Sequence, residues 1–251
     1  MHTCRNQGGV TIVELVVTLL IASLVIIGVY EIQQDVSVKA DRESNKALLQ
    51  KDITTAAQLI EKDIRSAGFG VPGNGIALTN DSSGNSQLQI LVNFDNAKAR
   101  LTSAIAAAST KVPVVKPSGV VAGMWVCVPS GSSYNFVKVI EKKTGTADTL
   151  VLQNSAGAAL PSGTVLGCAR GMKYYTANGS LFKENNSSIS PVCGNITKLQ
   201  FAAIDSSGAV LAGPVTSAVS IRVTLGGSVG KGKAIYSTEE TTQVYIRNAG
   251  S

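Results

Sequence analysis

The chain has 251 residues, of which 44% are hydrophobic and 15% are charged, and its formal net charge is +6. This length allows one or two domains, and the hydrophobic content is sufficient for a sizeable core. The charged fraction is below the ~25% that is usual in globular chains. Lys142-Lys143 is the only adjacent pair of basic residues, so a solvated basic surface is favoured over a dedicated nucleic-acid-binding surface.

Residues 10–30 form an apolar stretch that predicts a transmembrane helix. The stretch has 21 residues, and about 20 apolar residues are needed to cross a bilayer. Glu14 is its only acidic or basic residue, and an ionised carboxylate in hydrocarbon costs at least ~2.5 kcal/mol. A free α-amino group at Val10 could neutralise Glu14 of the same or a neighbouring helix if the chain were cut after Gly9. The alternative is a signal-anchor helix whose Glu14 reaches the lipid headgroups.

Residues 1–9 form a polar leader with one formal charge, at Arg5. A secretory signal peptide would have an apolar region of about 7–15 residues followed by a small-residue cleavage site. Here the apolar stretch is longer and has no such site before Glu31. We therefore expect the apolar helix to stay on the mature protein.

Residues 31–67 contain no Gly or Pro and are expected to continue the same helix. Apolar residues recur at spacings of three and four, which places them on one helix face. These residues are Leu49, Ile53, Ala56, Ile60, Ile64 and Ala67, and the charged Lys51, Asp52, Lys62, Asp63 and Arg65 lie off this stripe. Gly68, Gly70 and Pro72 are expected to end the helix.

Residues 68–251 have the pattern of short strands and turns, so the predicted fold class is α+β. Expected strands lie at 88–94, 124–128, 135–140, 149–153, 164–166, 198–204, 218–225 and 241–247. The clearest hairpin joins 172–177 to 180–183 through Asn178-Gly179, which favours a type I′ turn. Residues 226–233 are expected to form a mobile glycine-rich loop.

Three cysteines remain once Cys4 is removed with the leader, so one disulfide and one odd thiol are expected in an oxidising compartment. Cys168 and Cys193 flank the hairpin and are the favoured pair, with Cys127 as the alternative partner. No C-x-x-C motif is present, which argues against a zinc site. The only histidine, His2, lies in the leader. Because no catalytic or dinucleotide motif is found either, no enzyme activity, cofactor or metal is expected.

Residues 9–15 resemble the class III signal of type IV prepilins and pseudopilins. In that family a prepilin peptidase cuts after the glycine and methylates the new N-terminal residue, and the fifth mature residue is a glutamate. The resemblance implies cleavage between Gly9 and Val10, N-methylation of Val10, and a role for Glu14 in assembly and register. The family favours Phe at the first mature position, where this chain has Val10. Residues 60–69, 174–182, 196–208 and 244–248 are similar to landmarks of PilW-type minor pilins and J-type pseudopilins.

The resemblance implies a type IV pilin-like α+β fold in which a long N-terminal α-helix packs on an antiparallel β-sheet head. Residues 10–30 would be the transmembrane and assembly half of the helix, and residues 31–67 its periplasmic half. Residues 68–251 would form the head. Residues 75–163 depart most from the family, and we expect a strand-rich insertion there.

The implied function is that of a minor pilin that helps to initiate pilus assembly at or near the tip. Its partners would be prepilin peptidase, inner-membrane lipid before assembly, and other minor pilins and the major pilin through the N-terminal helix. DNA is a secondary candidate that the basic head allows. The protein would sit in the inner membrane as a single-pass protein with a periplasmic head, and later in the pilus. The alternatives are a J-type pseudopilin of type II secretion and a membrane-anchored adhesion or ligand-binding module.

Overall fold

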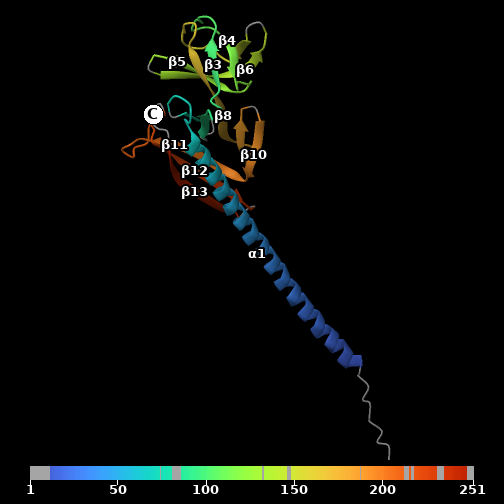
Figure 1. Cartoon of the computed structure of the whole chain (residues 1–251). Helices are drawn as coiled ribbons and strands as arrows, with labels where there is room; N and C mark the ends of the chain where they lie inside the picture. The colour runs from blue at the N-terminus through green and yellow to red at the C-terminus, as the bar shows by residue number, and fades with distance from the viewer. Residues whose placement is uncertain are drawn as a thin grey trace, which may run out of the picture. The chain divides into compact units, whose positions relative to one another are not determined.

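The computed structural model describes residues 12–73, 75–80, 86–131, 133–145, 148–186, 188–211, 215, 218–230 and 235–247. The chain divides into two compact units, Met1–Leu48 and Leu49–Ser251, and helix α1 (Ile12–Ser66) contributes to both. In the first unit, residues 12–48 are helical and none of them is buried. The second unit, here named the head, contains the end of α1 and, among the described residues, thirteen strands (Figure 1). The predicted α+β fold class is confirmed.

The expected strands and the 172–183 hairpin are present, together with strands that the sequence patterns did not predict. The bounds are β1 Ile76–Asn80, β2 Ser86–Val92, β3 Lys98–Leu101, β4 Lys111–Ser118, β5 Trp125–Ser130, β6 Ser133–Lys143, β7 Asp148–Leu152, β8 Val165–Ala177, β9 Ser180–Asn185, β10 Ser188–Gly194, β11 Ile196–Ile204, β12 Ser220–Val229 and β13 Tyr236–Tyr245. Asn178 and Gly179 between β8 and β9 have φ values of 50° and 69°. Two successive positive φ angles are those of the predicted type I′ turn.

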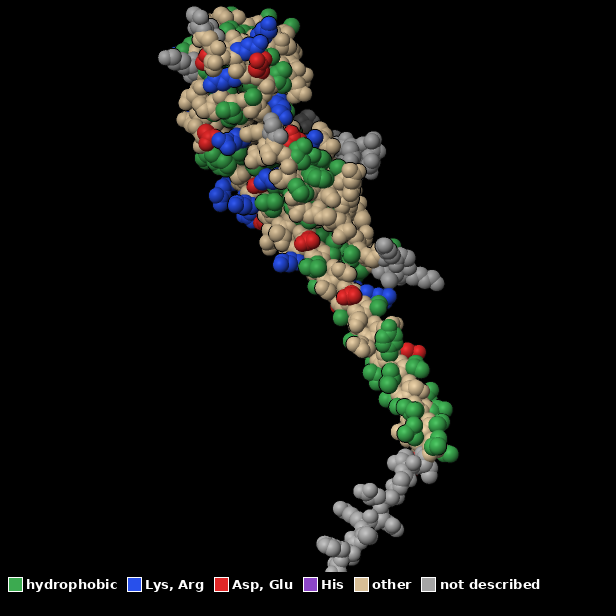
Figure 2. Space-filling view, turned by 90° about the vertical axis from the view of Figure 1, so that its right-hand side faces the viewer, with side chains coloured by type: hydrophobic (Ala, Val, Ile, Leu, Met, Phe, Trp, Pro, Cys, Tyr) green, Lys and Arg blue, Asp and Glu red, His purple; other side chains and the backbone are tan. Residues whose placement is uncertain are grey.

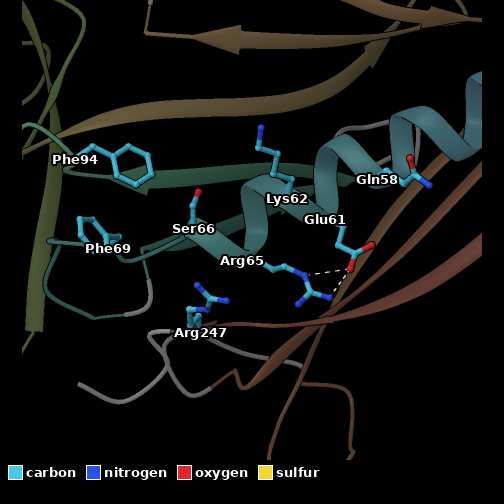
Figure 3. A pocket seen from close by; sticks show the side chains of 8 residues that line it. All are labelled: Gln58, Glu61, Lys62, Arg65, Ser66, Phe69, Phe94 and Arg247. Carbon is cyan, nitrogen blue, oxygen red and sulfur yellow. Dashed lines mark hydrogen bonds and ion pairs between the residues drawn. The ribbon is translucent and has the colours of Figure 1, made fainter.

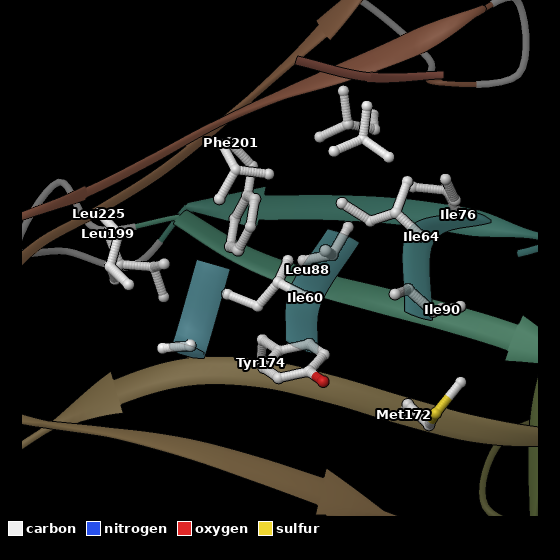
Figure 4. Packing of buried hydrophobic residues seen from close by; sticks show 14 of the residues in the cluster. Ile60, Ile64, Ile76, Leu88, Ile90, Met172, Tyr174, Leu199, Phe201 and Leu225 are labelled. Atoms are coloured by element: carbon white, nitrogen blue, oxygen red, sulfur yellow. The ribbon is translucent and has the colours of Figure 1, made fainter. Parts of the chain in front are cut away.

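Two sheets of the head enclose the end of α1. One is an open antiparallel sheet in the order β1-β2-β8-β9-β10, and the other is the antiparallel sheet β11-β12-β13. Their buried side chains and those of α1 form one cluster, here named the first core. Figure 4 shows Ile60 and Ile64 of α1 among Leu88 and Tyr174 of the open sheet and Phe201 of β11. The first core therefore fixes residues 49–66 of the helix to the head.

Six strands close into a ring that has its own core. The order β8-β3-β4-β7-β6-β5 returns to β8 through a β5–β8 pairing, and all of these pairings are antiparallel. We refer to this ring as the barrel. Its interior, the second core, contains buried residues between Ala97 and Cys168. Closure leaves the barrel without open strand edges, which suits a body that is added to an existing sheet.

The barrel occupies less of the chain than the insertion expected at residues 75–163. Ile76 of β1 and Leu88 and Ile90 of β2 belong to the first core, because both strands extend the open sheet beside β8. The segment with a separate core begins at Ala97 and ends at Cys168. Strand β8 serves both bodies, since its first half pairs with β3 and β5 and its second half with β2 and β9.

The predicted apolar stripe of α1 is confirmed, because Leu49, Ile53, Ala56, Ile60, Ile64 and Ala67 are all buried. Asp63, which lies off the stripe, is also buried. Its carboxylate accepts hydrogen bonds of 2.5 Å from both the Tyr174 hydroxyl and the Lys183 ammonium group. Burial raises the pKa of the Tyr174 hydroxyl well above its usual value, as do the hydrogen bond that it donates to Asp63 and the negative charge of Asp63. Tyr174 therefore stays protonated and remains a donor.

Gly226 and Gly227 lie inside β12 and not in the loop expected at residues 226–233. They pair with Glu239 and Thr238 of β13. A Cβ atom on Gly227 would lie 2.7 Å from the Asn195 carbonyl oxygen and 3.0 Å from a methyl group of Leu49. Glycine is required here because the Asn195 backbone approaches β12 closely and a side chain of α1 packs beside it. The part of the expected loop at residues 231–233 lies outside the described residues.

We predict that Asp63→Ala lowers the free energy of unfolding by about 3 kcal/mol, because it leaves the Lys183 charge and the Tyr174 hydroxyl without their acceptor in the interior. Chemical unfolding of the full-length protein in detergent micelles, followed by circular dichroism, measures the change. The matched control is Glu61→Ala, which removes a surface pair with Arg65 on the same helix and should cost less than about 1 kcal/mol. Equal effects of the two substitutions would contradict a structural role for the buried carboxylate.

Candidate functional site

The first part of α1 exposes apolar side chains on all sides. Between Ile12 and Tyr30, every large hydrophobic side chain is at least half exposed, from Val17 at 51% to Ile12 at 84%. Among the described helices, α1 has the length and composition to cross a membrane, and its most apolar 18-residue window has a mean hydropathy of 2.8 with no buried residue. In Figure 2, hydrophobic side chains cover most of the visible face of this segment. Such a surface requires lipid or the helices of other subunits around it.

The hydroxyl groups of Thr18 and Ser23 in this segment are satisfied within the helix. The Thr18 hydroxyl donates to the Glu14 carbonyl oxygen at 2.7 Å, and the Ser23 hydroxyl donates to the Leu20 carbonyl oxygen at 2.8 Å. Such bonds to a preceding turn let hydroxyl groups enter an apolar environment. The Glu14 carboxylate is then the one side chain between Ile12 and Tyr30 that brings a formal charge into that environment.

Only part of the predicted processing and assembly site falls within the described residues. Glu14 lies in the first turn of α1. Gly9 and Val10, the residues expected to flank the cleaved bond, lie outside the described residues. The geometry between Glu14 and a new N-terminus at Val10 therefore stays a prediction.

The three described cysteines are thiols that lie in three different clusters. Cys168 belongs to the second core, and Cys193 packs against the first core. Cys127 belongs to a third cluster with Val71, Leu91 and Ala169, here named the junction cluster because it joins the barrel to the open sheet.

The structure does not bring Cys168 and Cys193, the favoured disulfide pair, together. Cys193 faces Leu181, and Leu181 faces Thr176 of β8. Cys168 lies eight residues before Thr176 on the same strand, which is about 26 Å in an extended strand. A disulfide requires Cα atoms within about 7 Å. The physical reason is the length of β8. Cys168 lies near its start, whereas Cys193 of β10 lies across β9 from its end.

The alternative partner Cys127 is close to Cys168 in the β5–β8 ladder, where Val126 faces Cys168 and Cys127 faces Gly167. Consecutive residues of a strand point to opposite faces. The side chains of Cys127 and Cys168 therefore enter different clusters, the junction cluster and the second core.

A groove of about 570 Å³ on the head brings aromatic and basic side chains together (Figure 3). The rings of Phe69 and Phe94 lie 5.3 Å apart at an interplanar angle of 31°, and both are more than half exposed. Lys62, Arg65 and Arg247 also line the groove, and Arg65 is bonded to Glu61 at 2.5 Å. This surface offers planar rings and cationic groups to an anionic partner.

Sequence patterns did not reveal this groove because its residues come from the end of α1, the segment after β2 and the segment after β13. These segments are separated by many residues, so no local Lys/Arg cluster with interleaved aromatic residues is visible along the chain.

Comparison with protein families gives one match. Residues 4–30 match the model of the prokaryotic N-terminal methylation motif. The match supports a type IV prepilin-like protein. It implies processing by a prepilin peptidase, assembly with other pilins, and membrane anchoring through the apolar helix. The motif is typical of structural proteins. No curated protein and no solved structure matches the chain.

We predict that the cysteines of this prepilin-like protein react slowly with a thiol reagent at pH 8 in the folded state. Burial raises the pKa of Cys127 and the pKa of Cys168 to about 12 each. The nearby Cys168 thiol also raises the pKa of Cys127 by charge repulsion. Burial and the charge of Asp52 raise the pKa of Cys193 to about 11. At pH 8 about one Cys193 in a thousand is then a thiolate, the reactive form.

Unfolding the mature protein in denaturant without reductant should release three reactive thiols, which Ellman's reagent counts. An unprocessed chain should release four, because it retains Cys4. A count of one in the mature protein would instead demonstrate a disulfide and would contradict the separation of the three thiols.

Proposed function

We propose that the protein is a PilW-like minor pilin of a type IV pilus that helps to initiate assembly and is located at or near the pilus tip. The observation that carries this proposal is the exposed apolar part of α1, which lies within the residues that match the methylation motif and contains one carboxylate. Such a helix needs two successive apolar environments, the bilayer before assembly and a bundle of like helices afterwards.

The apolar surface of the helix makes its transfer from lipid into a bundle tolerable. Burying one Leu, Ile or Val side chain away from water contributes ~1.5–3 kcal/mol, and a bundle preserves this contribution when the helix leaves the bilayer. Ala22, Ser23 and Gly28 allow neighbouring helices to approach closely. Gly28 in particular has no atom within 4 Å of the position that a Cβ would take.

In this proposal Glu14 selects the register of the bundle. Cleavage between Gly9 and Val10 creates an α-amino group, which is methylated. The amine of one subunit then neutralises the Glu14 carboxylate of its neighbour, because an ionised group in hydrocarbon is stabilised by an opposite charge. One axial offset between helices permits this pairing.

The head supports a position at the end of a filament. It contains the first core, which holds α1, and in addition the barrel with the second core. We propose that the barrel is an insertion into a pilin-like head. A head with an additional body has fewer steric constraints at a filament end, where it has neighbours on one side, than within a helical shaft.

The proposed partners are prepilin peptidase, inner-membrane lipid before assembly, and other minor pilins and the major pilin through α1. The topology proposed before assembly is a single pass through the inner membrane with the head in the periplasm. A J-type pseudopilin of type II secretion would use the same helix. A membrane-anchored adhesion or ligand-binding module would need the helix as an anchor alone.

We predict that Glu14→Gln, which removes the charge and preserves the side-chain shape, reduces surface piliation at least tenfold while the chain is still processed. Electron microscopy and immunoblotting of sheared pili measure assembly. The matched control is Thr18→Val, one turn away, which removes a hydroxyl bonded to its own helix and should preserve piliation. Normal piliation with Glu14→Gln would count against charge-directed assembly.

A second prediction concerns processing and the choice of machine. Intact-mass measurement of the mature protein should show loss of residues 1–9 and one methyl group at Val10, and Gly9→Val should block both. Deletion of the gene should abolish piliation and preserve protein export. Loss of export with normal piliation would favour the pseudopilin. If an unrelated membrane anchor could replace residues 1–30 without loss of function, the protein would be a membrane-anchored adhesion or ligand-binding module and the minor-pilin proposal would fail.

A further inference from the structure

A second groove lies where the barrel meets the open sheet. Its volume is about 340 Å³, within the range of about 300–1,000 Å³ that is usual for small-molecule sites. Strands β5 and β6 contribute Trp125, Tyr134, Asn135 and Phe136, and strand β2 contributes Gln89. All nine described residues that line the groove are uncharged. This composition differs from that of the basic groove in Figure 3.

Strand register places the aromatic side chains on one face of the β5–β6 hairpin. Trp125 pairs with Lys138, Cys127 with Phe136, and Pro129 with Tyr134. Every second residue of a strand shares a face, so Trp125, Phe136 and Tyr134 point to the same side. Trp125 and Phe136 pack against the junction cluster, whereas Val126 and Val137 between them belong to the second core. The hairpin thus seals the barrel with one face and presents aromatic rings with the other.

A glycine leaves room for one of the groove side chains. A Cβ atom on Gly171 would lie 2.4 Å from Nε1 of Trp125. Asn186 fixes Gly171 through two hydrogen bonds. The Gly171 N–H donates to the side-chain oxygen of Asn186 at 3.0 Å, and the backbone N–H of Asn186 donates to the Gly171 carbonyl oxygen at 2.8 Å. The indole is therefore positioned before a ligand arrives, which lowers the entropy cost of binding.

The polar groups of the groove retain their hydrogen-bonding capacity. Within the described part of the chain, the side chains of Gln89 and Tyr134 make no hydrogen bond. The Gln89 amide offers both a carbonyl acceptor and an NH₂ donor. Backbone groups beside them are committed, since the Leu91 N–H donates to the Gly75 carbonyl oxygen at 2.7 Å and the Gly68 N–H donates to the Leu91 carbonyl oxygen at 3.0 Å. A ligand in this groove would therefore be recognised by side chains and not by backbone groups.

We propose that this groove binds a neutral saccharide of one or two sugar units. The apolar C–H face of a pyranose ring packs on the rings of Trp125 and Tyr134, and the amide of Gln89 and the hydroxyl group of Tyr134 bond to its hydroxyl groups. Hydroxyl groups both donate and accept, as the amide does. An anionic ligand would find no cation in the lining, and an extended peptide would find no free backbone row at Gly75 and Leu91. The site is independent of the assembly helix.

Trp125 is the only tryptophan of the chain, so intrinsic fluorescence reports directly on the groove. Full-length protein is purified in a detergent whose headgroup is not a sugar and is titrated with chitotetraose, maltotetraose and mannotetraose. We expect at least one of the three to produce a saturable change in Trp125 emission with a dissociation constant below about 10 mM. The absence of a saturable change with all three would overturn the proposal.

Variants separate the groove from other aromatic surfaces. Tyr134→Ala and Gln89→Ala should each weaken binding about tenfold, because each removes one ring or hydrogen-bond contact. The control Tyr245→Ala removes a tyrosine that is 66% exposed on β13 and should leave binding unchanged. Thermal unfolding verifies that the variants are folded. Binding that is unaffected by both groove variants, or a stronger response to an uncharged proline-rich peptide than to every saccharide, would refute the saccharide site.

Discussion

The structure depends on one constraint, which is that a single helix must suit two environments. Residues 12–48 of α1 bury no side chain, whereas residues 49–66 supply a stripe that is enclosed by two sheets. Residues 12–30 carry apolar groups around the whole circumference, and residues 49–66 confine them to one face. A helix that is apolar all round requires lipid or other helices, and an amphipathic helix requires a core on one side. Burial of the helix begins at Leu49, where the division between the two units also falls.

Within the head, strand β8 connects two bodies that have separate cores. Its first half closes the barrel, and its second half lies in the open sheet against α1. The junction cluster fills the space between the bodies with small and aromatic side chains. Because the strand is continuous and the junction is packed, the two bodies share a surface on which residues from both can meet. The uncharged groove occupies that surface.

The hydrogen bonds of Asp63 show how a polar group strengthens a specific arrangement in this head. The buried Asp63 carboxylate of α1 accepts hydrogen bonds from the Tyr174 hydroxyl and the Lys183 ammonium group of the β8–β9 hairpin. The same hairpin carries the turn at Asn178 and Gly179. Apolar packing alone tolerates small rotations of a helix, whereas a bonded charge fixes its rotation and its position along the sheet.

The sequence by itself determined the elements whose signals are local. These are the apolar span with Glu14, the stripe from Leu49 to Ala67, the Asn178-Gly179 turn and most strands, because each follows from periodicity or from the conformational preference of a few neighbouring residues. Only the tertiary structure decided that Asp63 is buried, that β1 and β2 belong with the first core, that Gly227 lies in a strand beneath α1, and that Cys168 and Cys193 lie apart. It also decided which aromatic, basic and amide side chains share a groove. Such outcomes depend on strand order and register, which join segments far apart in the chain, and no local pattern encodes them.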